Sequence, residues 1–372
     1  MHHSLVVRGH RTEASMEGIY QSISKLLRPS GKGRSDEKKQ NYSSDLPEGL
    51  CRRFSLGEIK RATNDFADDL VIGQGGFGKV YKGFIDDRGI SVAIKRFKTS
   101  SRQGVVELTN EVVLLCQIRH PNLIPLIGYC IDKGARCLVY EFMVNGNLRQ
   151  HICGTDHDPL PWKQRLAICI GVARGLHYLH TGLKHTIVHH DVKMNNILLD
   201  EKWEAKLTDF GLSKMGPPSL SKALFRNESR LVCSSLYMAP EYVMHGELTD
   251  KSDVFSFGVV LFELLCGRSA FDRNLEEGWG SLFNLVKYKQ EGTINKIIDP
   301  YLMGKIAPLC FKIYFGIVSS CMREEGKDRP AMGEVEVGLE RALLLQEIAD
   351  AAREEGEYDY PTDELTCSDS PI

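Results

Sequence analysis

The stretch IVHHDVKMNNILLD, Ile187–Asp200, gathers six polar side chains that could act as catalysts or metal ligands between two apolar runs. Such a stretch is compatible with a histidine-built metal site, a loop for phosphate chemistry, or a polar turn without a chemical role. The rest of the chain has to separate these alternatives. The six side chains, and three histidines just before them, are His189, His190, Asp191, Lys193, Asn195, Asn196, His177, His180 and His185.

A glycine-rich segment, GQGGFG, spaces Gly73, Gly75 and Gly78 as G-x-G-x-x-G. In a dinucleotide-binding fold this loop joins a strand to a helix, with an acidic residue about twenty positions later. Here it runs from one predicted strand into another, VAIK follows at Val92–Lys95, and no Gly-Lys-Ser/Thr of a P-loop is present. A strand–glycine–strand flap can cover a triphosphate with its backbone N–H groups, while Lys95 reaches the α- and β-phosphates as a point charge.

A buried lysine needs a counter-charge to stay protonated and in place. Glu111, in TNEVVLLC, is the favoured partner of Lys95, because apolar residues follow it and Leu115 continues the same buried face one turn later. Glu107 is the competing candidate. A solvated helix residue at position 111 is the plainer alternative.

Two further motifs give the opening stretch a context. Asp209-Phe210-Gly211 begins eighteen residues after Asp191, and Ala239-Pro240-Glu241 begins thirty residues after that. Asp191, Lys193 and Asn196 themselves follow the spacing D-x-K-x-x-N. With the glycine loop and VAIK, these motifs resemble the protein-kinase set in its usual order, over roughly Phe54 to Gln346.

Three longer blocks refine the resemblance: LTDKSDVFSFGVVLFELLCGRSAF, RHPNLIPLIGYC and CMREEGKDRPAM. They are similar to the plant receptor-like kinases and to the related Pelle-type and interleukin-receptor-associated kinases, particularly the Pto-like receptor-like cytoplasmic kinases. The resemblance implies Ser/Thr specificity, with some activity toward Tyr, and a role in receptor-linked signalling or plant immunity. It also implies ATP and Mg²⁺ as cofactors, with Mn²⁺ as a substitute, and protein substrates together with a receptor kinase or immune partner.

The same resemblance assigns roles in the transfer of a γ-phosphoryl group to a hydroxyl. Asp191 accepts the hydroxyl's hydrogen and orients it, Lys193 neutralises charge on the transferred group, and Lys95 with Glu111 completes the catalytic set. Asn196 and Asp209 are the implied metal ligands, because their oxygens suit a hard cation. The implied nucleotide-binding residues are Ile72, Gly73, Gly75, Gly78, Val80, Ala93, Lys95, Tyr140, Glu141, Met143 and Leu198.

Structural roles are implied as well. His189 is expected to pack against Phe210, Asp253 to brace the catalytic loop, and Glu241 to pair with Arg329. His177, His180 and His185 are then surface or packing residues rather than ligands.

Two positions depart from the family's pattern. Position 190 is His where Arg is commoner, which makes the chain a non-RD kinase. The substrate-side segment reads CSSLY, Cys233–Tyr237, where Gly-Thr-x-Gly-Tyr is frequent. Ser234 keeps a hydroxyl, but two glycines have become Cys233 and Leu236, and backbone angles that need glycine would have to adjust.

The expected fold is α+β: a bilobal protein-kinase fold with a small β-rich N-lobe, one main helix in it, and a larger helical C-lobe. Period-two segments predict strands around the glycine loop, and Ser55 followed by Glu58 predicts a capped helix. VFSFGVVLFELLCG, Val254–Gly267, predicts a buried helix. The expected domains are 1–53, basic and largely disordered; 54–69, a short leading helix; 70–143, the N-lobe; 144–346, the C-lobe, joined near Met143–Gly146; and 347–372, an acidic disordered tail.

Composition limits the remaining classes. The 372 residues, 42% hydrophobic and 26% charged, suit a globular protein of about two lobes, and a net charge of −2 gives no case for nucleic-acid binding. Eleven cysteines without a C-x-x-C pair indicate a reducing compartment. His2 excludes N-myristoylation of this start, and no apolar run approaches the ~20 residues that span a bilayer. We therefore expect a cytoplasmic protein, with MEGIYQSISKLLR near the N-terminus as an amphipathic segment for peripheral plasma-membrane or partner contact.

Two other classes of protein stay open on the sequence alone. The altered CSSLY segment favours a kinase-shaped scaffold or decoy with little catalysis. The histidines favour a metal hydrolase, although that reading leaves Lys95 and Asp209 unexplained.

Overall fold

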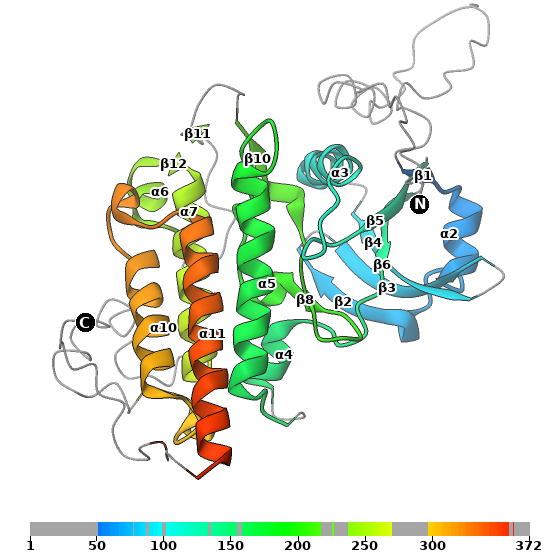
Figure 1. Cartoon of the computed structure of the whole chain (residues 1–372). Coiled ribbons are helices and arrows are strands. Elements are labelled where there is room, and N and C mark those ends of the chain that lie inside the picture. Colours follow the sequence, from blue (N-terminus) through cyan, green and yellow to red (C-terminus); the bar gives the residue numbers. More distant parts are fainter. Residues whose placement is uncertain are drawn as a thin grey trace, which may run out of the picture. The chain divides into compact units, whose positions relative to one another are not determined.

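The computed structural model divides into two compact units. The first consists of Met1–Ile118 and Pro125–Glu141, and the second of Arg119–Ile124 and Phe142–Ile372. Figure 1 shows strands concentrated in the first unit and long helices in the second, which confirms the α+β, bilobal kinase fold class. The structure describes residues 51–76, 78–86, 89–98, 102–132, 135–154, 158–216, 225–226, 237–269, 297–356 and 360.

A six-stranded sheet forms the centre of the first unit, in the order β1-β5-β6-β4-β3-β2. Its neighbouring strands are antiparallel except for β1 and β5, which are parallel. The strands predicted around the glycine loop are confirmed as β2, β3 and β4. The bounds are β1 Arg52–Arg53, β2 Val71–Gly75, β3 Gly78–Ile85, β4 Ile90–Phe97, β5 Leu126–Asp132 and β6 Ala135–Glu141.

Two α-helices accompany this sheet in the described part of the first unit, α2 (Leu56–Ala62) and α3 (Arg102–Leu115). The predicted capping box starts α2: the Glu58 N–H donates to the Ser55 hydroxyl, and the Ser55 N–H donates to the Glu58 carboxylate. The Glu58 pKa is lowered to about 2, mainly by hydrogen bonds from Ser55. The apolar side of α2 packs on the sheet and closes a core with Val92 and Ile94 at its centre.

The second unit is mainly helical. Helix α7 is almost completely buried: all its residues from Ser252 to Cys266 are buried, as the sequence predicts for this run. The helices are α4 Leu148–Cys153, α5 Trp162–Thr181, α6 Pro240–His245, α7 Asp250–Cys266, α10 Pro308–Cys321 and α11 Met332–Glu354. The short strands are β7 Ile187–Val188, β8 Ile197–Leu199, β9 Ala205–Leu207, β10 Lys214–Met215, β11 Phe225–Arg226 and β12 Glu247–Leu248.

The segment Arg119–Ile124 belongs to the second unit, although the sequence places it within the 70–143 lobe. The Ile124 N–H donates to the Leu207 carbonyl at 2.9 Å, and the Asn122 side chain donates to the Ala205 carbonyl at 3.0 Å. These bonds tie the segment to β9. Tertiary hydrogen bonding, which local sequence does not reveal, assigns it to that unit.

At both ends, the described structure extends past the predicted domain boundaries. At the N-terminal end, β1 pairs with β5 and Phe54 is 2% exposed, so order begins before residue 54. At the C-terminal end, α11 continues to Glu354, and the buried Tyr360 donates a hydrogen bond to Asp350 at 2.7 Å. Acidic composition predicts disorder, but a helix can carry acidic charges on its solvent face while its other face packs on α5 and α10.

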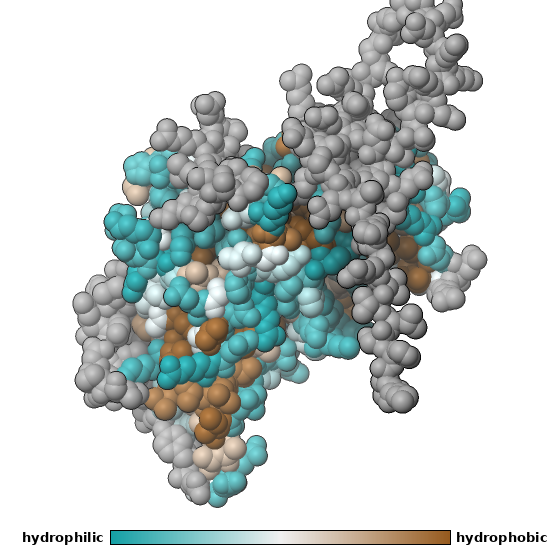
Figure 2. Space-filling model, turned by 45° about the horizontal axis from the view of Figure 1, so that its top comes forward, coloured by the Kyte–Doolittle hydropathy of each residue, from teal (hydrophilic) through white to brown (hydrophobic). Residues whose placement is uncertain are grey.

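Figure 2 shows mostly hydrophilic side chains on the described part of one face, interrupted by apolar patches. The exposed apolar side chains of α11 include Val337, Leu344 and Ile348. Among the described helices, none is both long and apolar enough to cross a membrane. The predicted amphipathic segment 16–28 and the residues Cys233–Leu236 lie outside the described residues.

Candidate active site

The first unit brings together the predicted lysine and glutamate. Lys95 lies on β4 and Glu111 on α3, and the Lys95 Nζ lies 2.5 Å from the Glu111 Oε1. The glutamate side chain is fully buried and the lysine side chain is 14% exposed. The alternative, Glu107, is also buried. The carboxylate therefore fixes the position of the Lys95 ammonium in a largely buried site.

A second donor reaches the same carboxylate, and the sequence did not predict it. The hydroxyl of Tyr140, on β6, donates to the Glu111 Oε2. The signal that could have revealed it is the strand register, because Tyr140 pairs opposite Ala93, two residues before Lys95. The register itself depends on tertiary pairing.

The glycine loop is the hairpin between β2 and β3. A Cβ added to Gly78 would lie 1.9 Å from the Arg96 carbonyl oxygen, so the fold itself requires glycine there. A Cβ on Gly75 would meet no described atom within 4 Å, and one on Gly73 would make only ordinary contact with Val80. Glycine at 75 therefore leaves open space beside the backbone, which fits the close approach of a nucleotide's phosphates.

In the second unit, three residues of the opening stretch form one cluster. The Lys193 ammonium donates to both carboxylate oxygens of Asp191, at 2.9 and 2.6 Å. The Asn196 amide donates to the Asp191 Oδ2 at 2.7 Å and to its main-chain carbonyl at 2.8 Å. Asp191 is 8% exposed. The amide oxygen of Asn196 is thereby directed away from Asp191, so it can serve as a ligand for a hard cation.

Asp209 follows shortly after strand β9, and a backbone hydrogen bond connects its neighbour Thr208 to the Asp191 cluster. The Thr208 N–H donates to the Asn196 carbonyl at 2.9 Å, which ties the two predicted metal-ligand positions together. Asp209 itself has φ 70° and ψ 67°, a left-handed conformation that few non-glycine residues adopt. Such outliers concentrate at functional sites, where the surrounding structure holds them. Carboxylate and amide oxygens suit Mg²⁺ or Mn²⁺.

His189 joins the catalytic loop to the strand that carries Asp209. Its Nδ1 accepts from the Asp191 N–H at 3.2 Å, and its Nε2–H donates to the Thr208 carbonyl at 3.1 Å. The ring packs edge-on against Phe210 with centroids 4.8 Å apart, the contact that the resemblance implies. Burial lowers the pKa of His189, although nearby carboxylates oppose the shift. The neutral ring is the form that can both accept and donate here.

Asp253, on α7, holds the same loop in place through hydrogen bonds. Its carboxylate accepts from the N–H groups of His189 and His190, at 2.7 and 2.8 Å, and from the His180 ring at 2.9 Å. Burial by itself raises the pKa of Asp253, but the hydrogen bond from His180 and the histidine contacts outweigh it and lower the pKa. His180 is therefore a buried support of the loop rather than a metal ligand.

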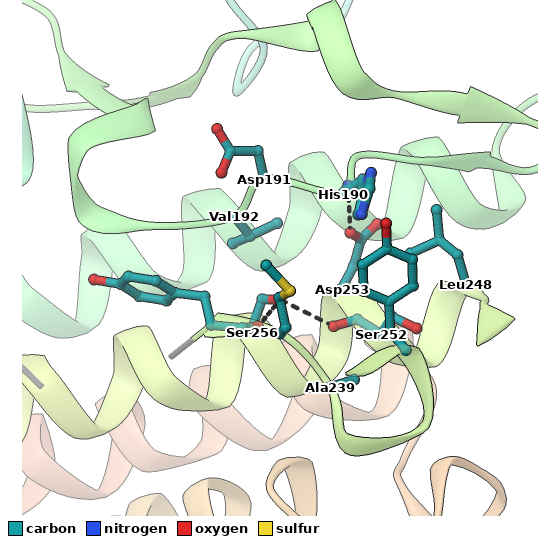
Figure 3. Close-up of a pocket in the computed structure, with 11 residues that line it drawn as sticks. His190, Asp191, Val192, Ala239, Leu248, Ser252, Asp253 and Ser256 are labelled. Carbon is teal, nitrogen blue, oxygen red and sulfur yellow. Dashed lines mark hydrogen bonds between the residues drawn. The ribbon is translucent and has the colours of Figure 1, made fainter. Parts of the chain in front are cut away.

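His190 lines a small pocket of the second unit (Figure 3). Its ring packs edge-on against Tyr242 at 4.8 Å, while Figure 3 shows the Asp191 side chain pointing away from α7. Burial lowers the pKa of His190. This position therefore carries a neutral, packed ring rather than the extended cation of an arginine.

Two polar side-chain pairs involve helix α6 and Tyr237, which lies just before it. Arg329 donates to both Glu241 oxygens at 2.8 Å, as the resemblance implies. The Tyr237 hydroxyl contacts both oxygens of Glu263, at 2.9 and 2.8 Å, which the sequence did not predict. Burial raises the pKa of Tyr237, so its hydroxyl stays protonated.

The remaining predicted nucleotide-binding residues are divided between the two units. Ile72 and Val80 lie on β2 and β3, and Ala93 and the exposed Glu141 lie on β4 and β6 of the first unit. Buried Met143 and half-buried Leu198 belong to the second. The segment after Met143 pairs with β8, since the Asn145 N–H donates to the Leu199 carbonyl and the Leu199 N–H to the Gly146 carbonyl.

The histidine-built metal site finds no support in the described part of the chain, where no group of three His, Cys, Asp or Glu could hold a metal ion. His177 instead contacts Glu336 at 2.7 Å, and the His185 Nδ1 contacts the Gly216 carbonyl at 3.1 Å.

Fold and site together define a protein-kinase domain, and comparison with known proteins gives the same class. Residues 68–339 match the family described as protein tyrosine and serine/threonine kinase, and the chain belongs to this family. Among its relatives in Arabidopsis thaliana, receptor-like protein kinase FERONIA is 51% identical over 312 residues, 83% of this chain and 34% of that protein. Receptor-like protein kinase ANXUR2 is 51% identical over 315 residues, 84% of this chain and 36% of that protein. The chain thus spans about a third of the length of these curated relatives.

Proposed function

We propose that this chain is an active serine/threonine protein kinase that transfers the γ-phosphoryl group of ATP to protein hydroxyls. The observation that carries the proposal is the Asp191 cluster, in which one buried carboxylate is fixed by Lys193 and Asn196. It is supported by the Lys95–Glu111 pair, which supplies a placed cation for phosphates.

The chain's own residues divide the work of transfer. Asp191 orients an acceptor hydroxyl and takes its hydrogen, while Lys193, already against that carboxylate, offsets charge on the group being transferred. Lys95 neutralises the α- and β-phosphates, and the open space beside Gly75 leaves room for them. When bound, Mg²⁺ held by Asn196 and Asp209 supplies further neutralisation of phosphate charge.

Finer aspects of the proposal concern cellular context. We assign the chain to receptor-linked signalling, with immunity as the pathway class, a receptor kinase or immune protein as partner, and the Pto-like receptor-like cytoplasmic kinases as subtype. The receptor-like names of the relatives support the assignment to receptor-linked signalling, and the resemblance of the motif blocks supports the subtype. The cytoplasm, with peripheral plasma-membrane contact, is the proposed location.

The test is phosphate transfer from labelled ATP, with and without Mg²⁺, to the chain itself or to a generic basic protein. Lys95→Met and Asp209→Asn are expected to abolish transfer while leaving the thermal unfolding transition in place. Lys98→Met is the matched control, because Lys98 is exposed just after the strand that carries Lys95.

A wild-type chain that binds nucleotide but incorporates no phosphate would contradict the proposal. That result would favour the kinase-shaped scaffold instead.

A further inference from the structure

Helix α11 presents an apolar stripe to solvent. Its members, Val337, Leu344 and Ile348, are 65%, 55% and 57% exposed. Their sequence spacing places them on one side of the helix, over about 16 Å. The opposite side of α11 packs on α5 and α10, the two long helices beside it in Figure 1. Single exposed apolar side chains are common, but a row of them on one helix face is typical of a surface that docks another helix.

A row of acids borders this stripe and is called the acidic edge here. Its members recur every seven residues, so they lie on one side of the stripe: Glu340, Glu347 and Glu354. Arg174 of α5 pairs with the first of them at 2.5 Å. Lys163 of α5 acts on the other two electrostatically, but it pairs with Asp350 at 2.9 Å. Glu347 and Glu354 are exposed and form no salt bridge with a described residue.

The charges on this face decide between its possible occupants. The residues after Gly356 contain five Asp or Glu and no Lys or Arg, so the acidic edge repels them. A membrane of anionic lipids is repelled for the same reason. A second copy packed antiparallel would bring the acidic edge against itself. In a parallel copy, Arg341, which is exposed within the stripe, would face its own equivalent.

The amphipathic segment 16–28 of the same chain also matches the face poorly. As the helix that its sequence predicts, it would place Ile19, Ile23 and Leu26 on the apolar side. The positions that border this apolar side are uncharged: Tyr20, Ser22 and Leu27. Lys25 and Arg28 lie farther round the helix, so they would not meet the acidic edge.

We propose that this face of α11 is a docking site for an amphipathic helix of a partner protein, with Lys or Arg bordering its apolar side. The partner's apolar side chains pack on the stripe, and its cations pair with Glu347 and Glu354. Apolar contacts at the centre supply most of the affinity, while charges at the rim select the partner. The face contains none of the residues assigned to phosphoryl transfer, so the proposal is independent of the proposed function.

The probe is a fluorescein-labelled synthetic peptide of about three heptads, with Leu at the a and d positions and Lys at the e and g positions. A second peptide with Glu in place of every Lys is its charge control. Fluorescence anisotropy with the full chain measures both Kd values. We expect saturable binding of the Lys peptide and at least about tenfold weaker binding of the Glu peptide. No saturable binding of the Lys peptide, or equal affinities, would overturn the proposal.

Leu344→Asn tests the apolar stripe without adding charge. It is expected to weaken the Lys peptide about tenfold or more, the scale of one leucine withdrawn from a buried contact. Val106→Asn is the matched control, because Val106 on α3 is 49% exposed, and it is expected to stay within about twofold of wild type. Thermal unfolding verifies that both variants fold. An unchanged Kd in Leu344→Asn, or an equal loss in both variants, would overturn the proposal.

Glu347→Lys tests the acidic edge. We expect it to weaken the Lys peptide about threefold or more and to strengthen binding of the Glu peptide by a similar factor. Glu201→Lys, at an exposed acid elsewhere in the second unit, is the control and is expected to change neither Kd by more than about twofold. The same shift in both variants would show only a response to net charge and would overturn the proposal.

Three further measurements on the full chain test the other occupants. Sedimentation velocity reports a second copy, and co-sedimentation with vesicles of phosphatidylcholine and phosphatidylserine reports a membrane. The Kd of the Lys peptide in Ile23→Asn reports the chain's own segment. A monomer that leaves vesicles unbound, with the same Kd in Ile23→Asn, supports the proposal. A dimer or vesicle binding that Leu344→Asn abolishes, or tighter peptide binding in Ile23→Asn, would overturn it.

Discussion

At the scale of single residues, the candidate acceptor base is defined by its hydrogen bonds. Asp191 receives donors from Lys193 and Asn196, and its own N–H is held by the His189 ring. The carboxylate is thereby fixed in one orientation before any substrate arrives. Positioned bases of this kind typically contribute about 10²–10⁴-fold to rate.

Replacing Asp191 with Asn tests this role. Asparagine keeps the shape of the side chain but cannot take up a proton from the acceptor hydroxyl. Turnover is therefore expected to fall about 10²–10⁴-fold while ATP affinity changes little. Single-turnover transfer and nucleotide binding, measured side by side, give the two quantities. Asp328→Asn, at an exposed acid, is the control. Loss of nucleotide binding with normal turnover of the bound fraction would assign Asp191 a different role.

His190 leads to a prediction about control by phosphorylation. Its neutral ring is packed against Tyr242, and it cannot grip a phosphate bidentately as arginine does. In kinases with arginine at this position, the guanidinium pairs with a phosphorylated residue of the activation loop, and the pairing orders that loop. The candidate hydroxyls here, Ser219, Ser221, Ser229 and Ser234, lie outside the described residues. We expect activity on an outside substrate to be independent of their phosphorylation, with control exerted by partners or the charged tails.

The measurement compares phosphatase-treated enzyme with autophosphorylated enzyme, with mock treatment as control. A change smaller than about tenfold, roughly 1.4 kcal/mol in the barrier, is the expected outcome. A larger drop on stripping would show that another cation, such as Lys214, or Arg230 outside the described residues, takes over the role of the arginine.

At the scale of elements, the β2–β3 hairpin contains two glycines for which we expect different roles, one in folding and one in nucleotide binding. Gly78 faces the Arg96 carbonyl, whereas the space beside Gly75 contains no described atom within 4 Å. Replacement by alanine should therefore lower mainly the stability at position 78 and mainly the nucleotide affinity at position 75.

Gly78→Ala is expected to destabilise the protein by about 1–3 kcal/mol, because a Cβ cannot share the space of a backbone oxygen. Gly75→Ala should change the free energy of unfolding by less than about 0.5 kcal/mol but weaken nucleotide binding, because the methyl group occupies space left for phosphates. Chemical denaturation and nucleotide titration of both variants provide the comparison. If Gly75→Ala binds nucleotide as wild type does, the backbone there does not approach the phosphates closely.

At the scale of the whole molecule, buried histidines set the response of stability to acid. Burial lowers the pKa values of His189 and His190 below that of an unfolded histidine, about 6.5. As pH falls below that value, the unfolded chain takes up protons that the folded chain does not, so unfolding is favoured. Their contribution is thus fully present above about pH 6.5 and is lost as pH falls.

We expect a lower free energy of unfolding at pH 5.5 than at pH 7.5, by up to about 1.4 kcal/mol for one histidine that stays neutral when folded. His190→Asn should reduce the difference, because asparagine does not titrate and tolerates the positive φ of 70° at this position. The exposed His245→Asn is the control. An unchanged pH dependence in His190→Asn would exclude this histidine as a source. The Asp253 and Glu58 carboxyls, whose pKa values are lowered, matter only at more acidic pH.

The amino-acid sequence by itself determined the class and the parts of the site. The glycine loop, VAIK, Asp191-x-Lys193-x-x-Asn196 and Asp209-Phe210-Gly211 resemble the protein-kinase motif set in its usual order, and this resemblance indicated phosphoryl transfer. Local period and capping chemistry identified the strands around the loop and the start of α2. These features are short-range, so the sequence carries them directly.

Tertiary structure decided which groups meet across long separations. The hydrogen bond from Tyr140 to Glu111 depends on strand register. The hydrogen bonds from the catalytic loop to Asp253 depend on the packing of α7. The acidic composition of residues 347–354 predicts disorder, yet these residues belong to helix α11. Packing on α5 and α10 gives this helix a buried face, and composition alone does not reveal that packing. Periodicity reports which side of an element is apolar, but the partner of that side is chosen by the energy of the assembled core.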